Sequence, residues 1–221
     1  MSRYGVTRIY LVRHGETDWN RAGRLQGRID TPLNPVGRQQ ARRLADWFAR
    51  HRISHVMTSP LTRARHTAAA IARSSGCGFS IDAALIELDH GSWAGRTVMD
   101  IAHTFPDAVS EGQLHAESVD ASGGESIDVA YARASRVLRR LLAVSPGGSM
   151  VVVGHGITNA LLICVATGQP SRQFDAYRQP NGCVDLLCFR RGGLVSLASC
   201  SLIGLAHNGH DCQAFPRSPG Q

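Results

Sequence analysis

Two runs of aliphatic, mostly β-branched residues constrain the fold of this chain more than any other feature. Thr7–Val12 and Ser149–Val153 have the composition of buried strands, and each is followed closely by a histidine beside a glycine, His14 and His155. Ligands of open α/β sheets bind beyond the carboxyl ends of the strands. We therefore expect the two histidines to share one site, built from both halves of the chain.

Helix signals alternate with the strand signals. Asn34-Pro35 has the residue types favoured at an N-cap and a first helical position, and apolar residues recur after it at helical spacing. We read Ser59-Pro60 in the same way, as the start of a helix with Arg63 in its first turn. The remaining expected elements are a short strand at His55–Met57, extended chain over Phe79–Leu88, helices over Glu125–Val144 and Ile157–Ala166, and a hairpin of Val184–Phe189 with Leu194–Ser199.

Strands that alternate with helices predict a layered α/β domain with a mostly parallel sheet. The 221 residues, 43% of them hydrophobic, suit one domain over residues 1–204 followed by a tail over 205–221. The polar stretch Asp107 to Gly124 is expected to cross the edge of the sheet. No run approaches the roughly 18 apolar residues of a membrane span, and no signal-peptide core is seen, so we expect a cytoplasmic protein without membrane contact.

Charge and cysteine usage exclude several classes of function. All 24 basic residues are arginines and give a net charge of +7, but they are dispersed, and aromatic residues make up only 6% of the chain. A nucleic-acid partner is therefore not expected. The six cysteines contain no CxxC pair and are interpreted as structural thiols. His207, His210 and Cys212 lack a fourth ligand at suitable spacing, so no metal site is predicted.

The chemistry of the candidate site follows from its residue types. A neutral imidazole at His14 can attack phosphorus and split one displacement into two easier steps. Arg13, Arg63 and, if it is protonated, His155 would compensate the charge on the phosphoryl oxygens. The leaving oxygen needs a proton, and Glu87, as a carboxylic acid of raised pKa, is the candidate donor.

The proton donor has alternatives in the same region of the chain. Asp89, Glu111 and Glu117 could reach the same pocket. Glu87 is preferred for its position before Gly91, Trp93 and Gly95, which are expected to form a close-packed turn.

These residues resemble the histidine phosphatase superfamily, which includes the cofactor-dependent phosphoglycerate mutases. The matching residues lie in the family's order along the chain: Arg13-His14-Gly15-Glu16-Thr17, Trp19-Asn20, Leu25-Gln26-Gly27-Arg28, Asp30-Thr31-Pro32-Leu33, Gly37, Ser59-Pro60-Leu61, Arg63-Ala64, Thr67-Ala68, Glu87, Gly91, Trp93, Gly95, Gly123-Gly124-Glu125-Ser126 and Gly154-His155-Gly156. A lone RHG tripeptide would be weak evidence, but this ordered set is highly specific.

The resemblance implies a three-layer α/β/α sandwich and a metal-free, cofactor-free mechanism through phosphorylated His14. By the same resemblance Arg13, Arg63 and His155 hold the phosphate and Glu87 is the proton donor. Three further positions are expected to contact the substrate: Asn20, Gln26 and Gly156.

Within this family the sequence favours a phosphatase over a mutase. Mutases carry a longer, basic, tryptophan- and proline-bearing insertion after the acid, whereas Thr97 to Ser122 here has no tryptophan or arginine, a single proline and several acids. The expected function is hydrolysis of small phosphomonoesters. A phosphoglycerate mutase is the alternative, and a catalytically silent phosphate-binding protein is less favoured.

Substrate selection is expected to depend on the excursion at 107–124 and the loop near Tyr177–Asn181. Arg172 and Arg178 are candidate selectivity residues, although surface charge is their commoner role. The sequence does not specify the substrate. Dimers occur in families of this kind, so a homodimer is left open.

Overall fold

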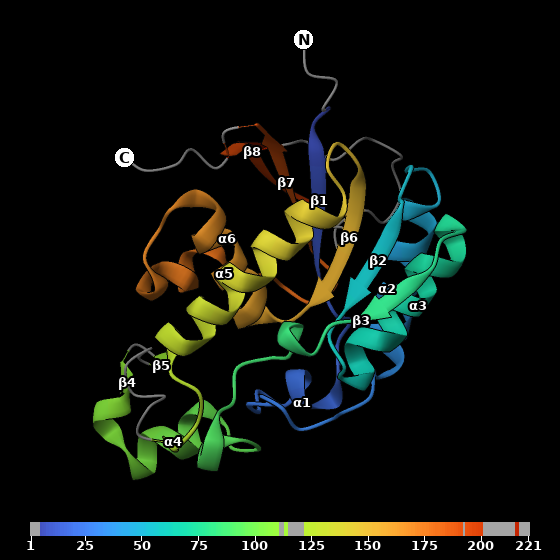
Figure 1. The fold of residues 1–221 in the computed structure, drawn as a ribbon. Coiled ribbons are helices and arrows are strands. Elements are labelled where there is room, and N and C mark those ends of the chain that lie inside the picture. Colours follow the sequence, from blue (N-terminus) through green and yellow to red (C-terminus); the bar gives the residue numbers. More distant parts are fainter. Residues whose placement is uncertain (1–4, 111–112, 115–121, 192, 201–214, 217–221) are drawn as a thin grey trace.

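A seven-stranded sheet with the order β3-β2-β6-β1-β7-β8-β9 forms the centre of the molecule (Figure 1). The computed structural model describes residues 5–110, 113–114, 122–191, 193–200 and 215–216. The strands are β1 (Thr7–Arg13), β2 (His55–Thr58), β3 (Phe79–Ile81), β6 (Ser149–Gly154), β7 (Val184–Arg190), β8 (Gly193–Cys200) and β9 (Phe215–Pro216), with β4 (Val109–Ser110) and β5 (Gln113–Leu114) forming a separate pair.

Four neighbouring strands, β3, β2, β6 and β1, run parallel, whereas β7, β8 and β9 are each antiparallel to the preceding strand of the sheet. The predicted α/β fold is confirmed, and its parallel part is this four-stranded half. In the β1–β6 ladder Val12 pairs with Val153 and Arg13 with Gly154. This register brings the residues that follow the two strands, His14 and His155, to the same carboxyl edge.

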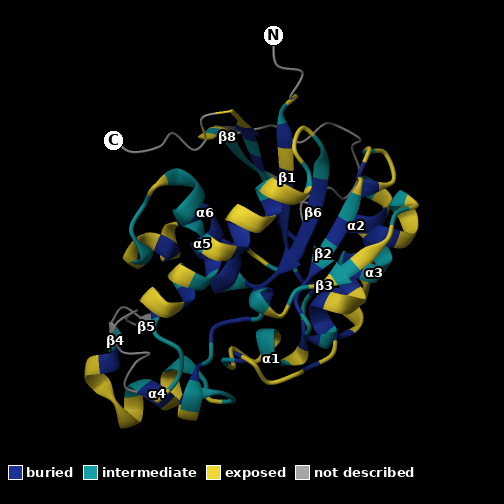
Figure 2. Ribbon diagram, in the orientation of Figure 1, coloured by how far each residue is buried: buried dark blue, intermediate teal, exposed yellow. Residues whose placement is uncertain are grey.

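Alternating side chains of the central strands divide the core into two halves. The central strands are largely buried (Figure 2). Ile9 and Leu11 of β1 pack against helices α5 (Ile127–Val144) and α6 (Gly156–Thr167), whereas Tyr10 and Val12 pack against α2 (Pro35–Phe48) and α3 (Thr62–Ser75). Successive side chains of a strand point to opposite faces, so a strand buried on both faces is apolar throughout. This explains the continuous apolar runs and gives a three-layer sandwich.

The helices begin near the predicted positions, with one error in the N-cap. Asn34 caps its helix by accepting the Gly37 N–H at 2.8 Å, as predicted. The helix expected from Pro60 begins at Thr62 instead, and Ser59 does not cap it. Asp30, from a distant loop, accepts the backbone N–H and the hydroxyl of Thr62, both at 2.7 Å.

The helices are α1 (Asp18–Arg21), α2 (Pro35–Phe48), α3 (Thr62–Ser75), α4 (Val98–Thr104), α5 (Ile127–Val144) and α6 (Gly156–Thr167), with 3-10 turns η1 (Ala83–Leu85), η2 (Gly91–Trp93), η3 (Pro106–Ala108) and η5 (Ser171–Tyr177).

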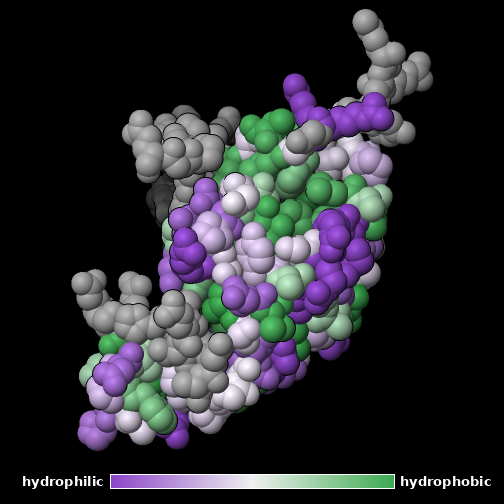
Figure 3. Space-filling view, turned by 60° about the vertical axis from the view of Figure 1, so that its left-hand side comes forward, coloured by the Kyte–Doolittle hydropathy of each residue, from purple (hydrophilic) through white to green (hydrophobic). Residues whose placement is uncertain are grey.

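The segment around α4 projects beside the sandwich, and in the space-filling view it carries apolar side chains among polar ones (Figure 3). A small cluster of Trp93, Ile101 and Ala108 forms its core. Met99 and Phe105 are exposed there. The stretch predicted to cross the sheet edge, Asp107 to Gly124, thus contains the end of the turn η3 and the β4–β5 pair. Its residues 111–112 and 115–121 lie outside the described residues.

Part of the predicted tail joins the sheet, because Phe215 and Pro216 pair with β8. His207, His210 and Cys212 lie outside the described residues. In the described part of the chain no helix is long and apolar enough to cross a membrane.

Candidate active site

The parallel register of β1 and β6 places the two predicted histidines side by side. Their ring centroids are 5.1 Å apart, and the backbone N–H of His14 donates to the Gly154 carbonyl at 3.1 Å. Both side chains are buried, with 3% and 0% of their surface exposed. The site predicted from both halves of the chain is thus one cluster at the carboxyl edge of the sheet.

Local hydrogen bonds fix the orientation of the His14 ring. Its Nδ1 lies 2.7 Å from the Gly15 carbonyl oxygen, which only accepts, so Nδ1 carries the hydrogen. The lone pair of the neutral ring therefore lies on Nε2. Asn181 holds the same turn by donating to the His14 carbonyl at 3.0 Å, and Thr67 accepts the Gly15 N–H at 3.2 Å.

Two arginines, the buried Arg63 and the half-buried Arg13, lie beside this ring. Arg63 donates to the carbonyls of Ile29 and Gly27, both at 2.8 Å, and Arg13 donates to the Gln179 carbonyl at 2.5 Å. The Nε atom of each arginine is buried and has no hydrogen-bond partner among the described residues. Burial lowers the pKa of both guanidinium groups, that of Arg63 to about 10, which leaves them protonated at neutral pH.

A buried network of side-chain hydrogen bonds holds Gln179, whose carbonyl binds Arg13. Asn159 of α6 donates to the Gln179 side-chain oxygen at 2.8 Å, and the Gln179 amide donates to the Leu11 carbonyl at 2.9 Å. Gly156 packs against the guanidinium, since a Cβ at this position would lie 3.5 Å from the Arg13 Cζ, in ordinary van der Waals contact. Gly156 thus sits against the predicted phosphate-binding arginine.

His155 is held by Ser59 rather than by a charged group. Its Nε2 lies 2.7 Å from the Ser59 Oγ, which also accepts the Leu61 N–H at 3.3 Å. Its Nδ1 is buried and has no partner within the described residues. Burial, reinforced by the charge of Arg63, holds the pKa of His155 and of His14 well below the usual value. The charge compensation predicted for His155 on condition that it is protonated is therefore not available in the ligand-free protein.

Glu87 occupies the N-terminus of α6. Its carboxylate accepts the backbone N–H groups of Leu88, Ile157 and Thr158 at 2.9, 3.2 and 3.0 Å, and the Thr158 hydroxyl at 3.1 Å. Burial raises the pKa of this carboxyl, but the hydrogen bonds and the nearby His90 outweigh it, so the net shift is downward. The expectation of a raised pKa for Glu87 is wrong in this state, because the charged form is the one that is solvated.

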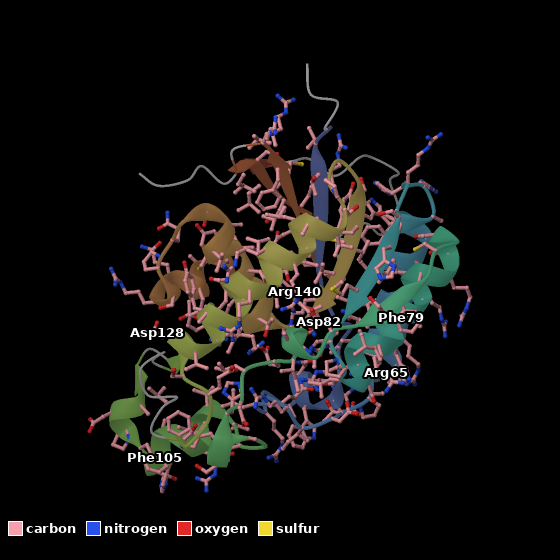
Figure 4. All side chains as sticks on the ribbon, in the orientation of Figure 1. Arg65, Phe79, Asp82, Phe105, Asp128 and Arg140 are labelled. Carbon is pink, nitrogen blue, oxygen red and sulfur yellow. The ribbon has the colours of Figure 1, made fainter. Side chains whose placement is uncertain are left out.

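Ion pairs hold the segment that carries Glu87 against α5. Arg133 binds Glu125 through two hydrogen bonds, at 2.9 and 2.6 Å, and donates to the carbonyls of Ala84 and Ile86, both at 2.8 Å. Arg140 and Asp82, which lie together in Figure 4, form a second pair at 2.5 Å. These contacts fix the position of Glu87 relative to both halves of the sheet.

The predicted substrate-contact residues Asn20 and Gln26 have their side-chain oxygens engaged within the protein. Asn20 Oδ1 accepts from the Thr17 N–H and from Asn181, at 3.1 and 3.2 Å. Gln26 Oε1 accepts the hydroxyls of Thr17 and Thr31. Both residues thus shape the loop that follows β1.

The alternative proton donors, the candidate selectivity residue Arg172 and the question of a metal site remain to be placed. Asp89 is partly exposed and pairs with Arg28 at 3.3 Å, whereas Glu111 and Glu117 lie outside the described residues. Arg172 is exposed. In the part of the chain that is described, no cluster of histidine, cysteine and carboxylate side chains could hold a metal ion.

Sequence reasoning missed the residues that support the site. Gln179, Asn159 and Asn181 contact it through side chains whose role depends on the folded loop. Asn159 carried a signal, since it is a polar residue within the apolar run of α6. Asp30 and Thr67 were matched only as members of the family's motifs, and no role was predicted for either.

The fold and the cluster define the class: an α/β protein with histidine and arginine side chains gathered at the carboxyl edge of its sheet. The chain belongs to the histidine phosphatase superfamily (branch 1), whose sequence model matches residues 9–200.

Three similar proteins illustrate the range within this family. A probable phosphoglycerate mutase, GpmB, of Serratia proteamaculans is 36% identical over 172 residues, which cover 75% of this chain and 77% of that protein. Phosphoserine phosphatase 1 of Hydrogenobacter thermophilus is 30% identical over 169 residues, 76% of this chain and 80% of that protein. A mycobacterial glucosyl-3-phosphoglycerate phosphatase, solved with VO3, has a TM-score of 0.70 at 27% identity and covers 81% of this chain and 90% of its own.

Proposed function

We propose that this protein is a phosphomonoesterase that hydrolyses small phosphate esters through a phosphohistidine on His14. The observation that carries the proposal is the set of buried nitrogen atoms beside His14 that have no partner among the described residues. These atoms are Arg13 Nε, Arg63 Nε and His155 Nδ1. Buried donors are almost always satisfied, so a set left unsatisfied in one place indicates a ligand with several acceptor oxygens.

The first step is in-line attack by the Nε2 lone pair of His14 on phosphorus. The N–P bond forms as the bond to the leaving oxygen breaks, and Glu87 supplies the proton to that oxygen. Arg13 and Arg63 compensate the charge on the equatorial oxygens throughout, which is the main task in phosphoryl transfer. In the second step water attacks phosphorus, Glu87 takes its proton, and inorganic phosphate leaves a neutral His14.

A bound phosphate provides the protonation state that Glu87 lacks in the free protein. A dianion placed beside a carboxylate opposes its ionisation and raises its pKa. The same dianion favours protonation of His155 and offsets the repulsion from Arg63. Substrate binding would thus prepare both groups for the first step.

The segment 97–122 supports hydrolysis rather than the mutase alternative. It contains no arginine, and Asp100 and Asp107 lie in its described part. A segment with several acids and no arginine is a poor environment for the bisphosphate that a mutase must retain. We propose that the pocket is lined by Asn20, Gln26 and Gly156. The side-chain amide nitrogens of Asn20 and Gln26 would contact the substrate, and Gly156 would let the backbone approach it closely. A small phosphorylated metabolite of the cytoplasm is the proposed partner, without nucleic acid or membrane.

The test is phosphate release from a panel of phosphomonoesters in excess chelator, with the variant His14→Ala alongside. The panel includes 3-phosphoglycerate and phosphoserine, after which the relatives are named, and glycerol 3-phosphate. We expect release that disappears in the variant. Interconversion of 2- and 3-phosphoglycerate without loss of phosphate would assign the chain to the mutases. Phosphate binding without turnover on any substrate would favour the silent binding protein.

A further inference from the structure

Thr158 is a buried residue whose hydroxyl lies between two acceptors. It is the third residue of α6, and only 2% of its surface is exposed. Its Oγ1 lies 2.8 Å from the Ile86 carbonyl oxygen and 3.1 Å from the Glu87 Oε1. A hydroxyl carries a single hydrogen, so it makes a well-directed bond to only one of these oxygens at a time.

The other donors to the Glu87 carboxyl are backbone N–H groups. Leu88 and Thr158 donate to Oε1 at 2.9 and 3.0 Å, and Ile157 donates to Oε2 at 3.2 Å. Backbone N–H groups only donate, and those of Ile157 and Thr158 are fixed in the first turn of α6. Among the hydrogen bonds that the described residues make to this carboxyl, the one from the hydroxyl can therefore be redirected by a rotation.

The two oxygens of Glu87 are unequally occupied. Oε1 has three donors and Oε2 has one, whereas a carboxylate oxygen has lone pairs for about two hydrogen bonds. A proton that joins the carboxylate is therefore favoured on Oε2. Oε1 then becomes a carbonyl oxygen whose lone pairs are filled by the N–H groups of Leu88 and Thr158, and the hydroxyl is released.

The Ile86 carbonyl can accept the released hydroxyl without losing its other partner. It also accepts the Arg133 guanidinium at 2.8 Å. A carbonyl oxygen has two lone pairs, so it accommodates both donors, and it keeps one of them when the hydroxyl turns away. Rotation of the hydroxyl thus leaves this carbonyl satisfied in both protonation states of Glu87.

We propose that Thr158 is a positioning residue for the proton transfer, and that Oε2 is the oxygen of Glu87 that gives and takes the proton. The hydroxyl donates to the carboxylate when Glu87 is ionised and to the Ile86 carbonyl when Glu87 is protonated. As the leaving oxygen takes the proton from Oε2, the hydroxyl returns to Oε1 and stabilises the charge that forms. The inference rests on the proposed phosphatase function and adds the residue that lets one fixed carboxyl be both acid and base.

Other charges act on Glu87, and a substitution at Thr158 leaves them in place. Burial raises the pKa of Glu87, whereas its backbone hydrogen bonds and a charged His90 lower it. Burial lowers the pKa of Arg13 of β1 and of Arg63 of α3, and the charge of Glu87 opposes that shift. Arg28 donates to the backbone carbonyl of Glu87 at 3.5 Å.

The test measures the pH dependence of the first step in single turnovers with saturating enzyme. Wild type is compared with Thr158→Val, Thr158→Ser and the control Thr167→Val. Valine keeps the shape of threonine and removes the hydroxyl, while the Ile86 carbonyl keeps Arg133. Thr167, at the other end of α6, donates to the Ile163 carbonyl at 2.8 Å, so the control removes a hydroxyl of the same helix away from Glu87.

With glycerol 3-phosphate, whose leaving oxygen needs a proton, the rate should fall at high pH as Glu87 loses its proton. This basic limb should move up by about one pH unit in Thr158→Val, because the carboxylate has lost a charge-assisted hydrogen bond. Thr158→Ser and Thr167→Val should keep the wild-type limb. With p-nitrophenyl phosphate, whose leaving phenolate needs no proton, Thr158→Val should show no such shift.

Several results would overturn the inference and leave the phosphatase standing. They are an unchanged limb in Thr158→Val, the valine limb in Thr158→Ser, the same shift in Thr167→Val, or the same shift with p-nitrophenyl phosphate. Glu87→Gln should abolish the limb, and a limb that persists there would remove Glu87 and Thr158 together from the proton transfer. Absence of His14-dependent turnover in wild type would overturn the phosphatase proposal, and this inference with it.

Discussion

The substitution Glu87→Gln removes the proposed proton donor while keeping the shape of the side chain. In wild type the Glu87 Oε1 accepts three hydrogen bonds and Oε2 accepts the Ile157 N–H at 3.2 Å. Glutamine can keep its oxygen in the Oε1 position, but its NH2 group would then face the Ile157 N–H. Turnover should fall because an amide neither gives nor takes the proton.

The expected cost to folding follows from the same contacts. Two buried donors that face each other cost about 1–3 kcal/mol, and loss of a negative charge at a helix N-terminus costs about 0.3–2 kcal/mol. A total of about 2–4 kcal/mol corresponds to a fall in Tm of roughly 5–15 °C for a domain of this size. The variant should therefore fold, so its kinetics can be measured.

The diagnostic assay compares a poor and a good leaving group in Glu87→Gln. General acid catalysis is worth about a hundredfold or more, so phosphorylation of the enzyme by glycerol 3-phosphate should slow by at least that factor. With p-nitrophenyl phosphate the leaving phenolate needs no proton. A burst of p-nitrophenolate should then precede slow hydrolysis of the phosphoenzyme. An equal loss of the first-step rate on both substrates would refute the role of Glu87 as proton donor.

Three further predictions concern the groups around the site. Because the pKa values of His14 and His155 are held well below 6.5 in the folded protein, the unfolded chain binds more protons at acidic pH. The free energy of unfolding should therefore fall as pH drops below about 6.5, by about 2–3 kcal/mol for the pair at pH about 5.5. Denaturant titrations of His155→Asn should show a smaller loss. Gly37→Ala lies in a helix, where alanine usually stabilises, yet its Cβ would lie 2.0 Å from a backbone oxygen of the loop after β1; calorimetry should show a lower Tm, and a rise would contradict the close approach. Arg133→Gln should destabilise by about 3 kcal/mol by leaving Glu125 without its bidentate partner, and Arg133→Lys should restore little of it; full rescue by lysine in urea titrations would count against the two-bond geometry.

The parts of this site that local patterns encode could be predicted from the sequence. The apolar runs before His14 and His155 defined two strands, and the rule that ligands bind at carboxyl ends placed both residues at one edge. The position of Arg63 in the first turn of its helix could also be predicted, but the residue that caps this helix could not. Asp30 caps that helix from another loop, a contact that depends on tertiary structure.

The protonation states could not be predicted in this way. A role in proton donation suggests a raised pKa for Glu87, whereas the folded chain directs three backbone N–H groups at its carboxylate. Likewise, the pKa of His155 is lowered because burial and nearby positive charge, first that of Arg63, oppose its protonation. Such shifts depend on distances between residues far apart in sequence, and no local pattern carries them.

The central claim is that His14 carries the phosphoryl group, and rapid quench with 32P-labelled substrate tests it most directly. Samples stopped within the first turnover, with chelator present, are analysed for labelled protein and for the labelled residue. The account predicts an acid-labile, base-stable label on His14 that forms and decays at rates matching phosphate release, and no label in His14→Ala. Steady release of phosphate with no labelled protein, or a label on another residue, would contradict it.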